Sequence, residues 1–230
     1  MFLPLLILAS PKIWLIIMAV IPAVLLMRYV YRADRLDKES PRLLVSLVLM
    51  GIISTLIAYV IERVTDGIGS MATECLLIGL AEEGAKYLVL RYRTWKEPEF
   101  NCQFDGVVYA VFVSLGFALW ENISYVLSYG ISTALLRAVT AVPGHACFGV
   151  FMGVWYGLAK RFDLAGDVKG RKTSIALCII LPTLIHALYD YIAMTDVSEW
   201  VFLVFIAALF YVAFRIIKNA SARDYVFFRR

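Results

Sequence analysis

The sequence predicts an all-α protein, a polytopic bundle of about seven transmembrane helices. Of its 230 residues, 62% are hydrophobic and 17% are charged, and the mean hydropathy is +0.80. Soluble domains average about 45–50% apolar and about 25% charged residues. Apolar runs of about twenty residues recur, each long enough to cross a hydrocarbon core about 30 Å thick. Basic residues gather in alternate connections between these runs, as expected for a membrane protein with a fixed orientation.

The expected spans are the apolar runs bounded by charge, at about 3–27, 43–61, 68–90, 106–128, 137–159, 173–195 and 199–217. Pro4, Pro11 and Lys12 interrupt the first run, so its helix is expected to begin nearer Ile13. No basic leader precedes this run, which indicates a retained span rather than a cleaved signal peptide. We expect residues 1–230 to form a single membrane domain.

The second run, 43–61, holds no charged residue, but the third, 68–90, contains Glu82, Glu83 and Lys86. On a helix Lys86 lies at i,i+4 from Glu82 and at i,i+3 from Glu83, so its ammonium can pair with either carboxylate. A buried ion pair between helices would account for one Glu and one Lys. Two adjacent carboxylates exceed what one Lys neutralises, which favours a functional site.

The fourth and fifth runs carry polar groups on otherwise apolar helices. Glu121 lies in the fourth run, where a hydrogen bond between helices is the simplest structural explanation. In the fifth run His145 begins a ladder with Gly149, Gly153 and Gly157, all on one helix face. Small residues at this spacing let a neighbouring backbone approach closely. His145 is therefore expected to point into the bundle.

The sixth run places His186 at i,i+4 from Asp190, where the carboxylate can accept a hydrogen bond from the imidazole and orient it. The last run, 199–217, ends before a basic tail. Five charged residues and both histidines thus lie inside expected spans. Facing lipid, the five charges would cost about 15 kcal/mol. They are expected to face the protein interior or a wet cavity.

Depth along the helices predicts that these groups meet. At about 1.5 Å per residue, four helices bring polar groups to one layer slightly outward of the midplane, namely Glu82, Glu121, His145 and His186. Carboxylates, imidazoles and an ammonium in a partly dry cavity suit hydrolysis, because a buried glutamate can take a proton from water. A metal is the other option, since Glu121, His145 and His186 match the three-ligand pattern of catalytic zinc.

The basic residues also give an orientation. Most of the 22 Lys and Arg lie in residues 28–42, 91–105, 160–172 and the C-terminal tail, whereas the alternate connections hold only Arg63 and Arg137. By the positive-inside rule the C-terminus is cytoplasmic and the N-terminus outside. The net charge of +4 comes from these connections and gives no reason to expect a nucleic-acid partner. The four cysteines have no ligand spacing, so no thiolate metal site is predicted.

The same residues carry a resemblance to a known family. Residues 82–86 fit the pattern EExxK, 117–121 fit FxxxE, His145 stands alone, and 186–190 fit HxxxD. Together with Phe104-Asp105-Gly106, this ordered set resembles the PrsW family of intramembrane proteases over about residues 25–215. That family is a branch of the superfamily of CAAX prenyl endopeptidases and bacterial abortive-infection-type membrane proteins.

The resemblance implies an endopeptidase of the bacterial cell membrane that makes the first, extracytoplasmic (site-1) cut in a single-span anti-sigma factor during a stress response. It makes Glu82 the lead candidate for the general base, with Glu121 and His145 holding water or a metal such as zinc. His186 with Asp190 would stabilise an oxyanion or serve as ligands, and Glu83 and Lys86 complete the catalytic set. The short outer connections, which carry few charges, predict that water and an extended peptide enter from outside.

Two other function classes remain compatible with the residues. A proton- or cation-coupled transporter also uses buried Glu, Asp, His and Lys as a relay. The polar groups are confined to one layer, however, and the sequence shows no repeat symmetry. A membrane-embedded adaptor or immunity protein that keeps the site without activity is the third class. Assays of peptide cleavage and of ion flux in liposomes separate the three.

Overall fold

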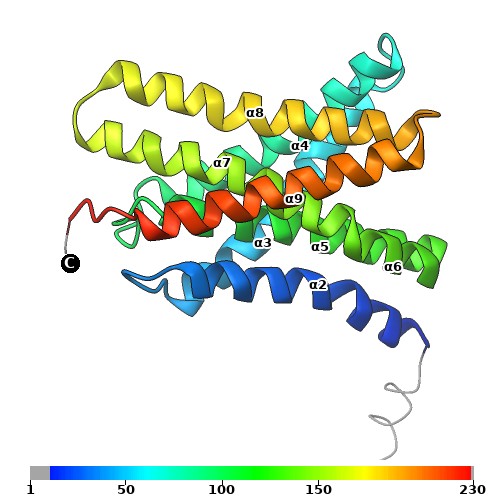
Figure 1. Ribbon diagram of the computed structural model, residues 1–230, viewed down its shortest axis with the longest axis horizontal. Coiled ribbons are helices and arrows are strands. Elements are labelled where there is room, and N and C mark those ends of the chain that lie inside the picture. Colours follow the sequence, from blue (N-terminus) through cyan, green and yellow to red (C-terminus); the bar gives the residue numbers. More distant parts are fainter. Residues whose placement is uncertain (1–10, 229–230) are drawn as a thin grey trace, which may run out of the picture.

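The computed structural model describes residues 11–228, which fold into α-helices joined by short connections (Figure 1). Seven of the described helices have 23 to 27 residues, and α6 has nine. Their bounds are α2 Pro11–Ala33, α3 Pro41–Thr65, α4 Met71–Thr94, α5 Asp105–Tyr129, α6 Ile131–Val139, α7 Ala141–Leu164, α8 Val168–Met194 and α9 Glu199–Ala222. The all-helical prediction is confirmed.

Six helical segments within the described residues are long and apolar enough to cross a membrane, one of them running through α6 and α7. The third expected span, 68–90, coincides with α4, which is long enough but carries Glu82, Glu83 and Lys86 among its apolar residues. The orientation of the bundle in a membrane stays a prediction.

The helix ends differ from the expected spans. The first helix, expected at 3–27, is described from residue 11 and continues to Ala33, while residues 3–10 lie outside the described part. The segment 129–136, expected as a plain connection, contributes most of α6, and α7 begins at Ala141 rather than 137. Backbone hydrogen bonds hold a helix beyond its apolar stretch, so hydropathy underestimates helix length.

Helices α5 and α7 form the centre of the bundle and bury most of their residues. α5 packs against α3 on one side and α7 on the other, α8 packs on α7, and α4 lies against α3 and α8 (Figure 1). The predicted glycine ladder is confirmed as the α5–α7 contact. A Cβ added to Gly153 would stand 2.5 Å from Val107 Cα, and one added to Gly157 would stand 2.1 Å from the Gln103 carbonyl oxygen.

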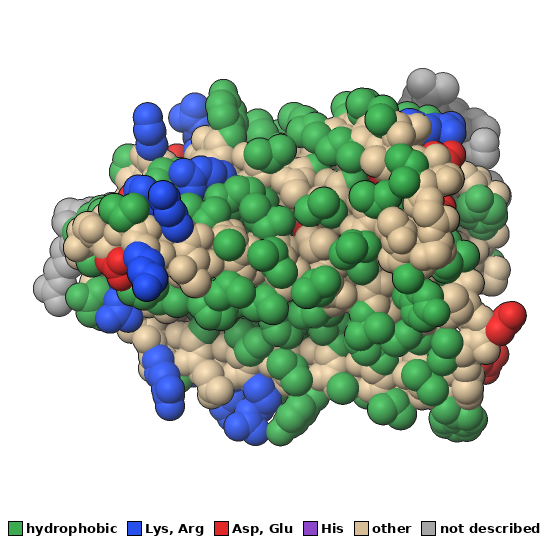
Figure 2. All heavy atoms as spheres, turned by 90° about the horizontal axis from the view of Figure 1, so that it is seen from above, with side chains coloured by type: hydrophobic (Ala, Val, Ile, Leu, Met, Phe, Trp, Pro, Cys, Tyr) green, Lys and Arg blue, Asp and Glu red, His purple; other side chains and the backbone are tan. Residues whose placement is uncertain are grey.

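Most of the visible Lys and Arg side chains gather at one end of the molecule (Figure 2). This basic end consists of the connections 34–40, 95–104 and 165–167 and of residues 223–228. The C-terminal segment is paired there with the α4–α5 connection, since Gln103 N donates to the Tyr225 carbonyl at 2.9 Å and Phe227 N to that of Asn101 at 2.7 Å. The backbone therefore closes over the basic end, while Arg229 and Arg230 lie outside the described residues.

Candidate active site

A close contact between α4 and α8 sets the first part of the site. A Cβ on Gly79 would stand only 2.9 Å from the Thr183 carbonyl oxygen, so the two backbones nearly touch one turn before Glu83. This contact brings His186 Nδ1 to 3.0 Å from Glu83 Oε1. Asp190, expected to orient His186, lies 3.5 Å from its Nε2. Glu83 is thus the nearer partner, and a carboxylate partner makes Nδ1 the protonated nitrogen.

Lys86 is fully buried and ties the α4 carboxylates to α7. Its Nζ lies 2.7 Å from Glu83 Oε1, 3.1 Å from Glu82 Oε2 and 3.1 Å from His145 Nδ1. The ammonium also stands 3.9 Å from the ring centroid of Phe117 on α5, a cation–π contact. The pairing expected from helical spacing is confirmed for both carboxylates. Because an ammonium can only donate, it fixes His145 Nδ1 as an acceptor.

The other nitrogen of His145 connects the cluster to α5 and α6. His145 Nε2 lies 2.8 Å from Glu121 Oε2, and Arg137 NH2 reaches the same oxygen at 3.1 Å. With Nδ1 accepting from Lys86, Nε2 carries the proton and donates it to Glu121. Glu121 therefore fixes the orientation of the His145 ring through its Nε2. Arg137 was counted only as a loop charge in the sequence, and no spacing rule linked it to Glu121.

Four of the expected site residues offer ligand atoms that lie within 4.8 Å of one another: Glu82, Glu83, His145 and His186. All four are buried, at 7%, 0%, 4% and 4% exposure. Within the described part of the chain Glu83 Oε2 has no hydrogen-bond partner. Glu121, expected among the metal ligands with His145 and His186, stands outside this group and contacts it through His145.

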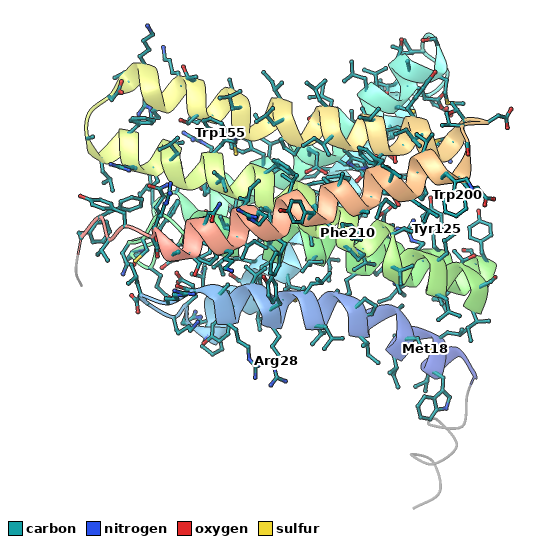
Figure 3. The ribbon with its side chains drawn as sticks, in the orientation of Figure 1. Met18, Arg28, Tyr125, Trp155, Trp200 and Phe210 are labelled. Carbon is teal, nitrogen blue, oxygen red and sulfur yellow. The ribbon has the colours of Figure 1, made fainter. Side chains whose placement is uncertain are left out.

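A cavity of about 280 Å³ opens beside the cluster, between α3 and α5. Glu82 and Glu121 both line it, so the two carboxylates reach the space that a peptide could occupy. Tyr125 lies on its wall, in the half of the molecule away from the basic end (Figure 3). A third carboxylate, Glu62 of α3, also lines the cavity. Glu62 was not among the predicted site residues, because it lies one residue beyond the expected span 43–61.

Comparison with known proteins identifies the family. The sequence profile described as "PrsW family intramembrane metalloprotease" matches residues 39–217. The chain belongs to the PrsW family. It is 33% identical over 207 residues to Protease PrsW of Bacillus subtilis, covering 87% of this chain and 93% of that protein. It is 34% identical over 213 residues to Protease PrsW of Geobacillus kaustophilus, covering 90% of this chain and 92% of that protein. No solved structure matches the chain.

Membership in the PrsW family makes this chain a multi-pass intramembrane protease with a protein substrate, and its relatives named above are bacterial. That favours peptide hydrolysis over the transporter and adaptor alternatives. The family description also names a metalloprotease, and the donor set fits a metal. Two carboxylates and two imidazoles are ligands that zinc prefers. Glu83 Oε2 is buried without a partner in the described residues, as a vacant ligand atom would be.

Proposed function

We propose that this protease hydrolyses a peptide bond just outside the transmembrane helix of a single-span membrane protein, an anti-sigma factor, on the extracytoplasmic side. One observation carries the proposal. Glu82 belongs to the buried Glu/His cluster and also lines the cavity between α3 and α5. It is therefore the cluster member that joins the buried charges to a space of about 280 Å³.

The two adjacent glutamates differ in what they can do. Glu83 is fully buried, and its Oε1 is held by Lys86 and His186. Glu82 is 7% exposed and contacts Lys86 at 3.1 Å. A general base must reach the proton that it abstracts, so Glu82 takes the proton of the attacking water. The water oxygen bonds to the scissile carbonyl carbon, and the proton then passes from Glu82 to the departing amide nitrogen.

The histidines and Lys86 do not line the cavity but lie next to Glu82, from where they stabilise the negative charge that develops on the carbonyl oxygen. Glu121 orients His145, and Glu83 orients His186, so neither ring has to reorganise during the reaction. Asp190 supports the Nε2 side of His186 at 3.5 Å. A zinc ion held by Glu83, His186 and, in place of the Lys86 ammonium, His145 would keep one position open and would supply Lewis-acid polarisation of the scissile carbonyl.

The side of entry follows from the helix directions. The cavity lies along the halves of α3 and α5 that lead away from the basic end. If the basic end is cytoplasmic by the positive-inside rule, the cavity faces outward. Carbonyl groups inside a helix are already hydrogen-bonded, so the scissile bond belongs to an extended segment beyond the substrate helix. This supports a site-1 cut.

The test uses the purified full-length protein in liposomes with a single-span anti-sigma factor as substrate. Mass spectrometry should place the cut on the extracytoplasmic flank of the substrate helix. Glu82→Gln and His186→Ala should each lower kcat/KM by at least about 10³-fold, as expected for groups that act in the transition state. Glu199→Gln, an exposed change at the start of α9, should behave as wild type. A cytoplasmic cut, or full activity in Glu82→Gln, contradicts the proposal.

Metal use is tested on the same preparations by elemental analysis. Wild type should carry zinc in stoichiometric amount, and Glu83→Gln should lose most of it because a buried ligand atom is removed. Chelation should abolish cleavage, and added zinc should restore it. Activity that survives prolonged chelation, in protein without bound metal, would instead support water activation by Glu82 alone.

A further inference from the structure

We propose that Glu62 forms a subsite that binds a Lys or Arg side chain of the substrate next to the scissile bond. The inference rests on the proposed entry of an extended peptide into the cavity between α3 and α5. It adds a specificity determinant that lies outside the catalytic cluster. Three features of the geometry point to this subsite. The cavity wall is acidic, the Glu62 carboxylate has no partner among the described residues, and aromatic rings lie around it.

The cavity wall is acidic. Its lining includes three carboxylates, Glu62, Glu82 and Glu121, and no Lys, Arg or His side chain. Two of these carboxylates have partners within the protein, because Glu82 contacts Lys86, and Glu121 contacts Arg137 and accepts a hydrogen bond from His145. Glu62 is the third.

Glu62 is half-buried, and among residues 11–228 its carboxylate makes no hydrogen bond or ion pair. The adjacent cation turns elsewhere, because Arg63 Nε donates to Tyr59 Oη at 3.0 Å and its guanidinium lies over the Tyr59 ring. A peptide that fills the cavity would strip water from Glu62. Removing a carboxylate from water without a partner is costly, so the occupant is expected to bring a cation.

A structural role at the helix end does not explain Glu62. It lies in the last turn of α3, which ends at Thr65. A negative charge near a helix C-terminus interacts unfavourably with the helix dipole. The carboxylate therefore costs stability where it stands. A residue that weakens its own helix and faces the substrate cavity is better explained by binding.

The surroundings fit a long basic side chain. Tyr59, Trp120 and Tyr125 line the cavity and are 54%, 48% and 41% exposed. Arg63 already covers the Tyr59 ring, and Arg137 lies 4.0 Å from the Tyr125 centroid. The Trp120 ring has no such cation among the described residues. Its face can pack the aliphatic stem of Lys or Arg and attract the charged group.

The experiment is a charge exchange between enzyme and substrate. Once the wild-type cut has been mapped, each position flanking it is replaced in turn by Lys, Gln or Glu, and kcat/KM is measured in liposomes. We expect one position where wild type prefers Lys to Glu by about tenfold or more. Glu62→Gln should bring that ratio close to one. Glu62→Lys should invert it, so that the Glu substrate becomes the better one.

Glu199→Gln is the matched control, since it removes an exposed carboxylate outside the cavity and should keep the wild-type ratio. Inversion of the preference in Glu62→Lys cannot arise from misfolding, because misfolding lowers the cleavage of both substrates by the same factor. Cleavage by wild type without charge preference, or a preference that both Glu62 variants retain, overturns the subsite alone. A wild-type protein that cleaves no substrate would instead count against the proposed function.

Discussion

At the residue scale, Lys86 shows how a charged cluster can exist inside a membrane protein. Its ammonium is fully buried and contacts Glu82, Glu83 and His145 within 3.1 Å. A buried charge is tolerated when it is paired and its hydrogen bonds are satisfied. The lysine thus holds two carboxylates together that would otherwise repel. Glu83 is fixed by this pairing, and Glu82 remains accessible from the cavity.

Two buried carboxyl groups outside the spans behave differently, because no cation pairs with their side chains. Asp34 and Glu39 lie at the basic end, 1% and 2% exposed, and among the described residues their carboxylate oxygens have no hydrogen-bond partner. Burial raises the pKa of Asp34 to about 6. Burial, together with the nearby Asp105, raises the pKa of Glu39 well above its usual range. Both groups therefore hold their protons to a higher pH in the folded protein than in the unfolded chain.

Glu39→Gln should stabilise the protein progressively as the pH rises. Below about pH 4, the unfolded-state pKa of a glutamate, wild-type Glu39 is protonated in both states and costs nothing. Above it, the unfolded chain ionises while the folded protein resists ionisation, so wild type loses stability that the amide retains. Melting temperatures in detergent between pH 5 and pH 9 should diverge in favour of the variant. Glu199→Gln should show no such trend, and a less stable Glu39→Gln at pH 9 would contradict the explanation.

At the element scale, the sequence predicted what apolar periodicity and spacing encode. The confirmed predictions are the helical class, the pairing within residues 82–86 and the close approach of the Gly149–Gly157 ladder to α5. The sequence did not predict α6, the contact of Arg137 with Glu121, or the position of Glu62 on the cavity wall. These depend on which helices become neighbours, and packing between helices decides that. A hydropathy window also discards charged residues at helix ends, where Glu62 lies.

The α4–α8 contact should be as important to activity as the side chains that it positions. In Gly79→Ala the new Cβ would meet the Thr183 carbonyl at 2.9 Å and Ala187 N at 3.3 Å, so the helices must separate. A displacement of about 1 Å between catalytic groups can cost about 10²-fold in rate. We expect kcat to fall by about that factor while the protein stays folded.

Gly84→Ala is the control on the same helix, because an added Cβ there meets nothing within 4 Å. It should keep wild-type kcat, and it should gain slightly in stability because alanine is the better helix former. The comparison is made by cleavage kinetics in liposomes and by thermal unfolding in detergent. Equal activity of the two variants would show that the spacing of α4 and α8 does not govern the site.

At the scale of the whole molecule, the basic side chains and the candidate catalytic cavity lie toward opposite ends. Most of the visible Lys and Arg side chains gather at the basic end (Figure 2). The residues that line the cavity lie in the far halves of α3 and α5. The expected orientation places the basic end in the cytoplasm. The protein then presents its cavity to extracytoplasmic segments of other membrane proteins. In that orientation we expect cytoplasmic peptides to have no access to the site.

Cysteine labelling tests this orientation. The native Cys75, Cys102, Cys147 and Cys178 are buried, so they give little background. In intact cells an impermeant thiol reagent should miss Lys96→Cys and Lys169→Cys, two exposed positions at the basic end. The same reagent should label Asp196→Cys, an exposed position at the other end. Labelling of Lys96→Cys and Lys169→Cys but not of Asp196→Cys would show that the protein has the opposite orientation in the membrane.

The contact between Gly51 and Gly116 has a mechanical consequence. A Cβ on Gly51 would stand 2.1 Å from the Val113 carbonyl oxygen, and one on Gly116 would stand 2.3 Å from that of Val48, so α3 and α5 meet there backbone to backbone. Counted at 1.5 Å per residue, Glu62 lies about 16 Å along α3 from this point. We expect this contact to be the pivot of any tilt of α3 against α5. A rigid tilt of α3 by about 10° around it would carry Glu62 sideways by about 3 Å, and Pro41, at the basic end, by a similar distance in the opposite direction.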